Sequence, residues 1–129
     1  GVLGVWDQRS FRQTVVMRYH GLVGKLRPWL NWFRRPPLPA PGQPLPFFSV
    51  AFVSTDDVAD FATLLRRVYN DAAGGEFSHF IIGLHEHDPR TAVLRDYTFT
   101  PFAGRLFAVT FDEPPDLDGR VPYVEVAFL

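Results

Sequence analysis

The sequence predicts an α/β fold with a mixed, mostly antiparallel sheet around a central parallel β-α-β unit and flanking helices. Two short apolar runs, 47–53 and 77–84, are rich in aromatic and β-branched residues, which is typical of strands buried on both faces. Between them, apolar residues recur every three or four positions from Val58 to Ala72, the spacing of one helix face. Because short joints connect the three elements, we expect a parallel crossover.

Both ends of the central helix carry local signals. Ser54 offers a hydroxyl and Asp57 a carboxylate three residues later, so their oxygens can accept the unpaired N–H groups of a first helical turn. Gly74 and Gly75 can adopt the left-handed conformation that ends a helix. We therefore expect a helix that starts at 54–57, where the Ser54 hydroxyl and the acids can cap it, and that ends before the two glycines.

Residues 1–35 are predicted to form a basic strand and helix arm. Val2–Trp6 is a short apolar run that favours a strand, and apolar residues at helical spacing from Phe11 to Leu26 predict an amphipathic helix. Pro28 disfavours helical geometry at the residue before it, so we expect this helix to end or bend there. A short second helical turn is predicted over 29–33.

Residues 36–46 hold six prolines in eleven positions. This composition predicts an extended, polyproline-like connection without ladder hydrogen bonds, which separates the arm from an α/β core at 47–129. The Pro-x-x-Pro spacings at 36–39 and 41–44 are of the kind that aromatic-grooved modules recognise. A stiff linker inside one protein is the commoner use of such a segment.

The last part of the chain is predicted to add one helix and two closing strands. The segment 90–97 has moderate helical character, whereas 105–111 and 123–129 alternate between the two faces of a strand. Glu125 stands in an otherwise apolar setting, and we expect it at an outward-facing edge position. Residues 114–119 have the composition of a turn.

Charge and composition limit the possible classes of protein. The chain has no cysteine, which excludes a disulfide framework and cysteine-based chemistry and fits a reducing, cytoplasmic compartment. Through Arg35 the net charge is +6, from seven basic residues and Asp7, and the remainder carries −7. No apolar run approaches the ~20 residues of a membrane span. Because the chain begins with Gly1 and an apolar segment, we expect a fragment of a longer protein.

Polar side chains gather at 85–88, directly after the second central strand. In open α/β sheets, ligands bind beyond the carboxyl ends of the strands. If the strand continues, His85 and His87 point to one side and can share a metal ion or a proton-transfer role. A metal normally needs a third ligand, so we predict no metal and favour a polar strand end. The sequence contains no nucleophile elbow, phosphate loop or dinucleotide fingerprint.

From Phe47 onward, the order of elements resembles the C-terminal half of the GNAT-type N-acetyltransferase superfamily. Residues 79–84 resemble the strand beside the acyl carrier, and 88–97 resemble the short helix whose tyrosine often protonates the leaving thiolate. The resemblance implies an acetyltransferase-like fold, acetyl-coenzyme A as the cofactor of an active enzyme, Tyr97 as general acid, and His85 or His87 as base. The position of the family's glycine-containing pyrophosphate turn holds two aspartates and no glycine.

Three hypotheses of function follow. The missing pyrophosphate turn favours an accessory, non-catalytic acetyltransferase-like domain, which pairs with another domain of the same longer chain or with a second copy. The alternative is an active N-acyltransferase that uses Tyr97. The third is an interaction module in which the arm Arg9–Arg35 contacts an anionic membrane or a partner through Trp29, Trp32 and Phe33. For these rings, packing onto the sheet or onto another domain is the favoured alternative, and nucleic acid is not a favoured partner.

Overall fold

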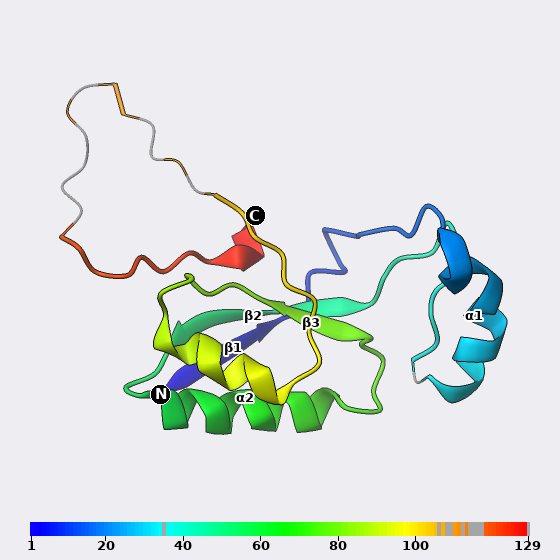
Figure 1. The fold of residues 1–129 in the computed structure, drawn as a ribbon, viewed down its shortest axis with the longest axis horizontal. Coiled ribbons are helices and arrows are strands. Elements are labelled where there is room, and N and C mark those ends of the chain that lie inside the picture. The colour runs from blue at the N-terminus through cyan, green and yellow to red at the C-terminus, as the bar shows by residue number, and fades with distance from the viewer. Residues whose placement is uncertain (35, 106, 108–109, 112, 114–117, 129) are drawn as a thin grey trace. The chain divides into compact units, whose positions relative to one another are not determined.

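The structure is a computed structural model that describes residues 1–34, 36–105, 107, 110–111, 113 and 118–128. The chain divides into two compact units, Gly1–Gly83 with Glu125–Leu129, and Leu84–Val124. Figure 1 shows the elements, which are β1 (Val2–Trp6), α1 (Gly21–Phe33), β2 (Phe47–Ser54), α2 (Val58–Ala72), β3 (His79–Ile82), and the 3₁₀ helices η1 (Pro89–Asp96) and η2 (Val126–Phe128).

The first unit is built on a three-stranded sheet in the order β1-β2-β3. β2 and β3 are parallel, with Phe47 opposite His79 and Val50 opposite Ile82, so the predicted parallel β-α-β unit is confirmed. β1 pairs with the other edge of β2 in the antiparallel sense. Within the described residues the sheet is therefore mixed, with one pair of each kind, and the expectation of a mostly antiparallel sheet is not met.

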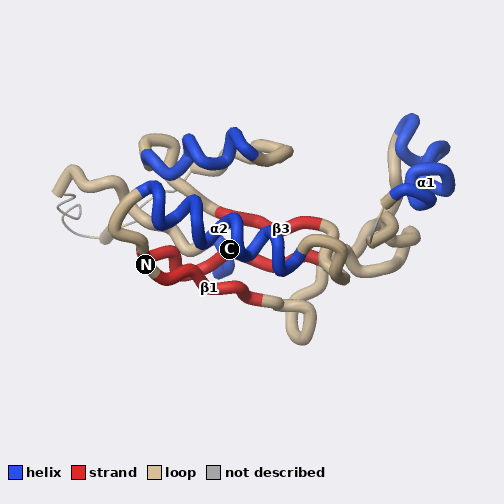
Figure 2. The backbone as a smooth tube through the Cα atoms, turned by 90° about the horizontal axis from the view of Figure 1, so that it is seen from below, coloured by secondary structure: helices blue, strands red, loops and turns tan. Residues whose placement is uncertain are grey.

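The core of this unit lies between β2 and α2. Phe48, Val50 and Ala51 of β2 are at most 2% exposed, and Phe61 and Leu65 of α2 are fully buried. Figures 1 and 2 both show α2 running along one face of the sheet. Phe61 and Leu65 lie one helical turn apart, so a single stripe of the helix supplies the burial.

Among the residues predicted to cap α2, Asp57 is the one that does so. The Asp57 side chain accepts a hydrogen bond from the Asp60 N–H at 2.7 Å. Ser54 is instead the last residue of β2 and pairs with Val2 of β1, which keeps it extended. The predicted helix end is confirmed, because Gly74 takes a positive φ of 75° just after the last turn.

The predicted helix from Phe11 to Leu26 is wrong in its first half. Residues before His20 are not helical, because Val15 forms a bridge with Pro44 in a distant segment. The Val16 N–H donates to Gln43 O, and the Leu45 N–H donates to Thr14 O. These long-range hydrogen bonds favour an extended conformation over the helix that the local apolar spacing predicts. α1 instead begins at Gly21 and ends at Phe33. It continues through Pro28, where the sequence predicted an end or a bend.

The proline-rich segment is therefore more than a spacer. Its predicted lack of ladder bonds is contradicted at 42–45, which pair with 14–16 through the bonds just described. The Tyr19 hydroxyl adds a hydrogen bond to Pro39 O at 2.9 Å. Residues 14–45 thus form a long hairpin with α1 at its tip, inserted between the antiparallel neighbours β1 and β2.

The predicted closing strands differ from the structure or lie outside it. Three residues of the predicted strand 105–111 fall outside the described residues, and those that are described are not in a strand. At the C-terminus, Val126–Phe128 form η2 instead of a strand. The cause is Glu125, whose carboxylate accepts the Phe52 N–H at 2.6 Å and the Ala127 N–H at 3.0 Å. Glu125 therefore folds the chain end back onto β2. The predicted helical segment 90–97 is confirmed as η1.

The bond from Phe52 to Glu125 also accompanies a local irregularity in β2. Phe52 is the one described non-glycine residue with a positive φ, at 52°. It lies where the register with β1 shifts between Val2 and Gly4. A left-handed conformation is costly for a residue with a side chain, so the carboxylate and the stacking of Phe52 on Trp6, at 6.0 Å between ring centroids, help to hold it.

We predict that Glu125→Ala lowers the free energy of unfolding by about 1–3 kcal/mol, because two backbone N–H groups lose an ionised acceptor. Urea denaturation followed by tryptophan fluorescence measures the effect. Glu86→Ala is the control, since Glu86 is exposed and its loss should change stability by less than about 0.5 kcal/mol. Equal stability of the two variants would contradict a role for Glu125 in fixing the chain end.

Candidate functional site

His85 and His87 lie close together in a turn, because β3 ends at Ile82 and does not continue through them as the sequence argument required. The centroids of the two rings are 5.4 Å apart, and the His87 N–H donates to His85 Nδ1 at 3.2 Å. The His85 carbonyl accepts from the Asp88 N–H at 2.9 Å, which closes the turn. In the part of the chain that the structure describes, no group of three or more side chains could hold a metal ion.

Asp88 is the most strongly held residue of the predicted polar cluster. Its side chain is only 7% exposed and accepts from Arg90 Nε at 2.9 and 3.0 Å and from Arg90 Nη2 at 2.6 Å. The Arg90 N–H donates to the same carboxylate and Thr91 Oγ1 to the Asp88 carbonyl, so Asp88 caps η1. The hydrogen bonds from the Arg90 side chain hold the pKa of Asp88 below its ordinary value. Asp88 is therefore a structural anion near neutral pH.

Tyr97 stands at the other end of η1. Its N–H donates to Leu94 O at 3.0 Å and its side chain is half-buried. Eight residues of 3₁₀ helix rise about 16 Å. The structure thus brings His85 and His87 together before η1, and it places Tyr97 after η1. Their roles as base and general acid stay predictions.

We predict that Asp88→Asn lowers the free energy of unfolding by about 2 kcal/mol at pH 7, through loss of the charged pair with Arg90. The lowered pKa of Asp88 means that its contribution is complete above its unfolded pKa of about 3.9 and is lost as pH falls through the folded value. The stability difference between wild type and variant should shrink below about pH 4. Urea denaturation across this range tests it, and a constant difference would contradict the assignment.

The basic aromatic arm presents a second candidate site on α1. The helix, all of which the structure describes, has no buried residue. Leu22, Leu26, Trp29 and Phe33 follow one another at steps of four, three and four, so they form one stripe, and they are 73%, 45%, 62% and 71% exposed. Val23 and Trp32 are exposed on its flanks. We call these six side chains the apolar face of α1.

The opposite, polar face of α1 is covered by the chain itself. Asn31 Nδ2 and Arg27 Nε donate to Leu38 O at 3.1 and 3.2 Å, and the Leu38 N–H donates to Asn31 Oδ1 at 2.7 Å. Arg27 and Asn31 are one turn apart and lie away from the stripe of Leu22 and Phe33. The proline-rich strand thus holds the polar side of the helix and leaves the apolar side without cover from the described chain.

Two rings of this face contact each other. Trp29 and Phe33, one turn apart, pack edge to face with 5.4 Å between their ring centroids. Lys25 lies one turn before Trp29, and Arg34 follows the last turn. In sequence, no acidic residue occurs between Asp7 and Asp56, so the whole hairpin is positively charged.

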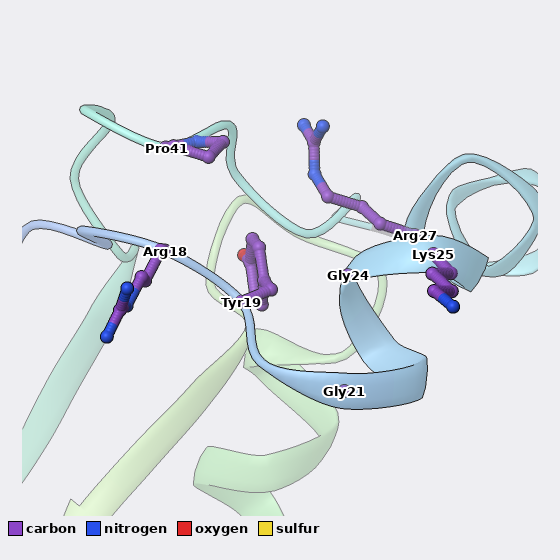
Figure 3. A pocket seen from close by; sticks show the side chains of 7 residues that line it. All are labelled: Arg18, Tyr19, Gly21, Gly24, Lys25, Arg27 and Pro41. Carbon is purple, nitrogen blue, oxygen red and sulfur yellow. The ribbon is translucent and has the colours of Figure 1, made fainter.

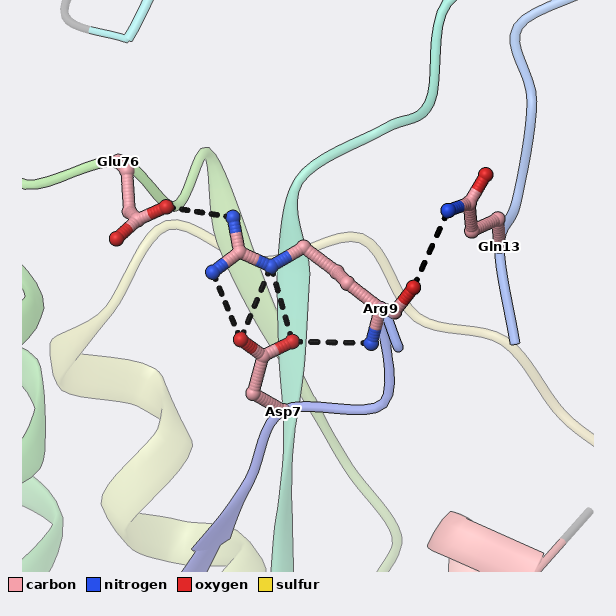
Figure 4. Close-up of polar contacts among 4 residues, drawn as sticks. All are labelled: Asp7, Arg9, Gln13 and Glu76. Carbon is pink, nitrogen blue, oxygen red and sulfur yellow. Dashed lines mark hydrogen bonds and ion pairs between the residues drawn. The ribbon is translucent and has the colours of Figure 1, made fainter. Parts of the chain in front are cut away.

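Arg9, at the base of the hairpin, stabilises the fold. Figure 4 shows its guanidinium between two carboxylates, with Nη2 2.7 Å from Asp7 Oδ2 and Nη1 2.6 Å from Glu76 Oε2. The guanidinium also lies over the Phe77 ring, 4.5 Å from its centroid. Gln13 Nε2 donates to the Arg9 carbonyl at 3.2 Å. This cluster ties the end of β1 to the segment before β3.

Comparison of the chain with protein-family models, curated proteins and solved structures gives no match. No helix in the described ranges is both long enough and apolar enough to cross a membrane. The sequence shows the rings and cations of the arm but not which face of α1 is covered, because nothing in the composition of the proline-rich segment indicates that Leu38 bonds to Asn31 and Arg27.

Proposed function

We propose that α1 attaches this protein to the surface of an anionic membrane. The observation that carries the proposal is the orientation of α1, whose polar face is bonded to Leu38 while its apolar face is exposed. A helix that is apolar on one face, cationic at its margins and rich in indole rings is suited to lie in the plane of a lipid interface. Trp side chains favour this boundary because their rings are apolar and their N–H groups are polar.

The positive charge of the hairpin favours an anionic membrane as the surface that α1 binds. All charged residues between Asp7 and Asp56, including those of the hairpin, are basic. Each Lys or Arg close to an anionic membrane adds about 1 kcal/mol to the binding free energy. The cytoplasmic leaflet is the membrane surface that is rich in anionic lipid, and it agrees with the absence of cysteine. Insertion of the apolar face supplies the remaining affinity, so binding is peripheral and reversible.

We predict that the protein binds vesicles containing phosphatidylserine and does not bind vesicles of phosphatidylcholine alone. Binding should weaken strongly with salt, because the Debye length falls from about 30 Å at 0.01 M to 3 Å at 1 M. Replacing Trp29 and Trp32 together by Ala should weaken it at least about tenfold, which corresponds to 1.4 kcal/mol or more. Vesicle sedimentation measures both effects.

The control removes two rings elsewhere that are more exposed than Trp29 and Trp32. Phe102 and Phe111 are 97% and 99% exposed and lie outside the hairpin, so Phe102→Ala with Phe111→Ala should leave vesicle binding unchanged. Equal loss of vesicle binding in both double variants would indicate non-specific binding by exposed aromatic rings. Absence of binding at low salt would overturn the proposal and favour an acidic protein partner or another domain.

The accessory acetyltransferase-like role is a second candidate. It is supported by the order β2, α2, β3 and η1, in which a parallel unit precedes a short helix as the resemblance implies. The start of α2 also agrees with a non-catalytic role. Asp57 accepts the Asp60 N–H there, so a carboxylate occupies the place where a coenzyme A pyrophosphate would need free N–H groups.

For this second candidate we predict no binding of acetyl-coenzyme A to the chain in a calorimetric titration. A dissociation constant below about 100 μM, worth about 5.5 kcal/mol, would contradict the accessory role and support the enzyme. In that case Tyr97→Phe should reduce the rate of acyl transfer without changing affinity, if Tyr97 is the general acid. His85→Ala and His87→Ala would test the base.

A further inference from the structure

The half-buried residues of α1 show which side of the helix the rest of the chain covers. They are Arg27, Leu30 and Asn31, and every other residue of the helix is exposed. Because each residue of an α-helix is turned by about 100° from the one before it, these three share one sector of about 100°. The centre of the opposite sector falls between Lys25 and Trp29. These two side chains therefore mark the middle of the uncovered side.

Lys25 lies in one row with both exposed indoles of the helix. Trp29 follows Lys25 by four residues and Trp32 follows it by seven, which is the spacing of side chains on one helix face. Figure 3 shows the Arg27 guanidinium reaching toward the segment that carries Pro41, whereas Lys25 extends from the opposite side of the helix. Lys25 is thus a cation on the side of α1 that carries the tryptophans.

The Lys25 side chain is suited to contact a group outside the chain. It is the only lysine among the thirteen Lys and Arg residues of the sequence, so lysine-specific chemistry reports on this one position. It is exposed, and within the described residues its ammonium has no ion-pair partner. A lysine stem can lie along an apolar surface while the ammonium reaches polar groups, which favours lysine at membrane interfaces.

Insertion of the uncovered side of α1 would move the Lys25 ammonium out of bulk water. Removing a charge from water is unfavourable unless an opposite charge pairs with it. An anionic headgroup supplies this partner, whereas the phosphate of a zwitterionic headgroup is already neutralised by its own cation. The cost of moving the ammonium is therefore offset on an anionic surface and not on a neutral one.

We propose that Lys25 contacts an anionic lipid headgroup directly and makes attachment through α1 selective for such lipid. The inference rests on the proposed membrane attachment and adds a specific contact to it. Under this proposal the selectivity comes from one ammonium on the inserted side, in addition to the net charge of the hairpin. Lys25 is then the residue whose loss changes binding in a way that other exposed cations do not reproduce.

The first experiment uses salt to separate a contact from a long-range charge, because a partly buried pair is screened much less than an exposed one. Lys25→Gln should weaken binding to phosphatidylserine vesicles about fivefold, which corresponds to the loss of one charge near the surface. Most of this loss should persist from about 0.01 M to about 1 M salt, as the Debye length falls from 30 Å to 3 Å.

Arg34→Gln is the matched control, since Arg34 is also exposed and directly follows α1. Its effect on vesicle binding should disappear at high salt. Lys25→Arg retains the charge and should bind nearly as well as wild type at both salt concentrations. The same salt dependence for the losses in Lys25→Gln and Arg34→Gln would overturn the contact.

The second experiment distinguishes a failed contact from a failed membrane proposal. An amine-reactive label modifies Lys25 and the α-amino group of the chain, and peptide mass spectrometry separates the two products. Phosphatidylserine vesicles should slow the modification of Lys25 several-fold. If the protein sediments with the vesicles and Lys25 is modified at the rate of free protein, membrane attachment stands and the contact is wrong. If the protein does not sediment with them, both proposals are wrong.

Discussion

The hydrogen bonds between α1 and Leu38 determine what the arm can do. Within residues 36–41, Leu38 and Ala40 are the non-proline residues, so the segment offers few backbone donors for a ladder. Asn31 compensates by both accepting from and donating to the backbone of Leu38, and Arg27 adds a bond to the same carbonyl. Because these bonds use the polar face of the helix, the apolar face is turned outward, and the suitability for a lipid interface follows from this orientation.

The sheet gives this arm a rigid base. The hairpin leaves the sheet after β1 and returns at β2, two strands that pair with each other, so both of its ends are fixed. Arg9 joins the first end to Glu76, and Glu125 holds the irregular end of β2. The basic residues thus have two roles: Arg9 stabilises the base through carboxylates, whereas Lys25 and Arg27 near the tip have no carboxylate partner in the described chain.

Sequence reasoning succeeded where local signals decide the structure and failed where distant contacts decide it. The unit β2-α2-β3 follows from periodicity and short joints. His85 and His87 are close because the turn after β3 brings their rings together, not because the strand continues through them. The start of α1 was wrong because Val15 pairs with Pro44, a contact that helical spacing does not reveal. The predicted C-terminal strand was wrong because Glu125 binds the Phe52 N–H. The contact of Leu38 with the polar face of α1 could not be predicted from the apolar spacing of the sequence.

The most direct test of the account is the depth of single tryptophans at a membrane. Variants that retain only Trp29 or only Trp6 would be bound to anionic vesicles whose lipids carry bromine at a shallow position of the acyl chain, which quenches nearby indole fluorescence. Trp29 lies on the apolar face of α1 and should be quenched, whereas Trp6 lies in β1 and should not. Bound protein with unquenched Trp29, or with both indoles quenched equally, would contradict attachment through α1.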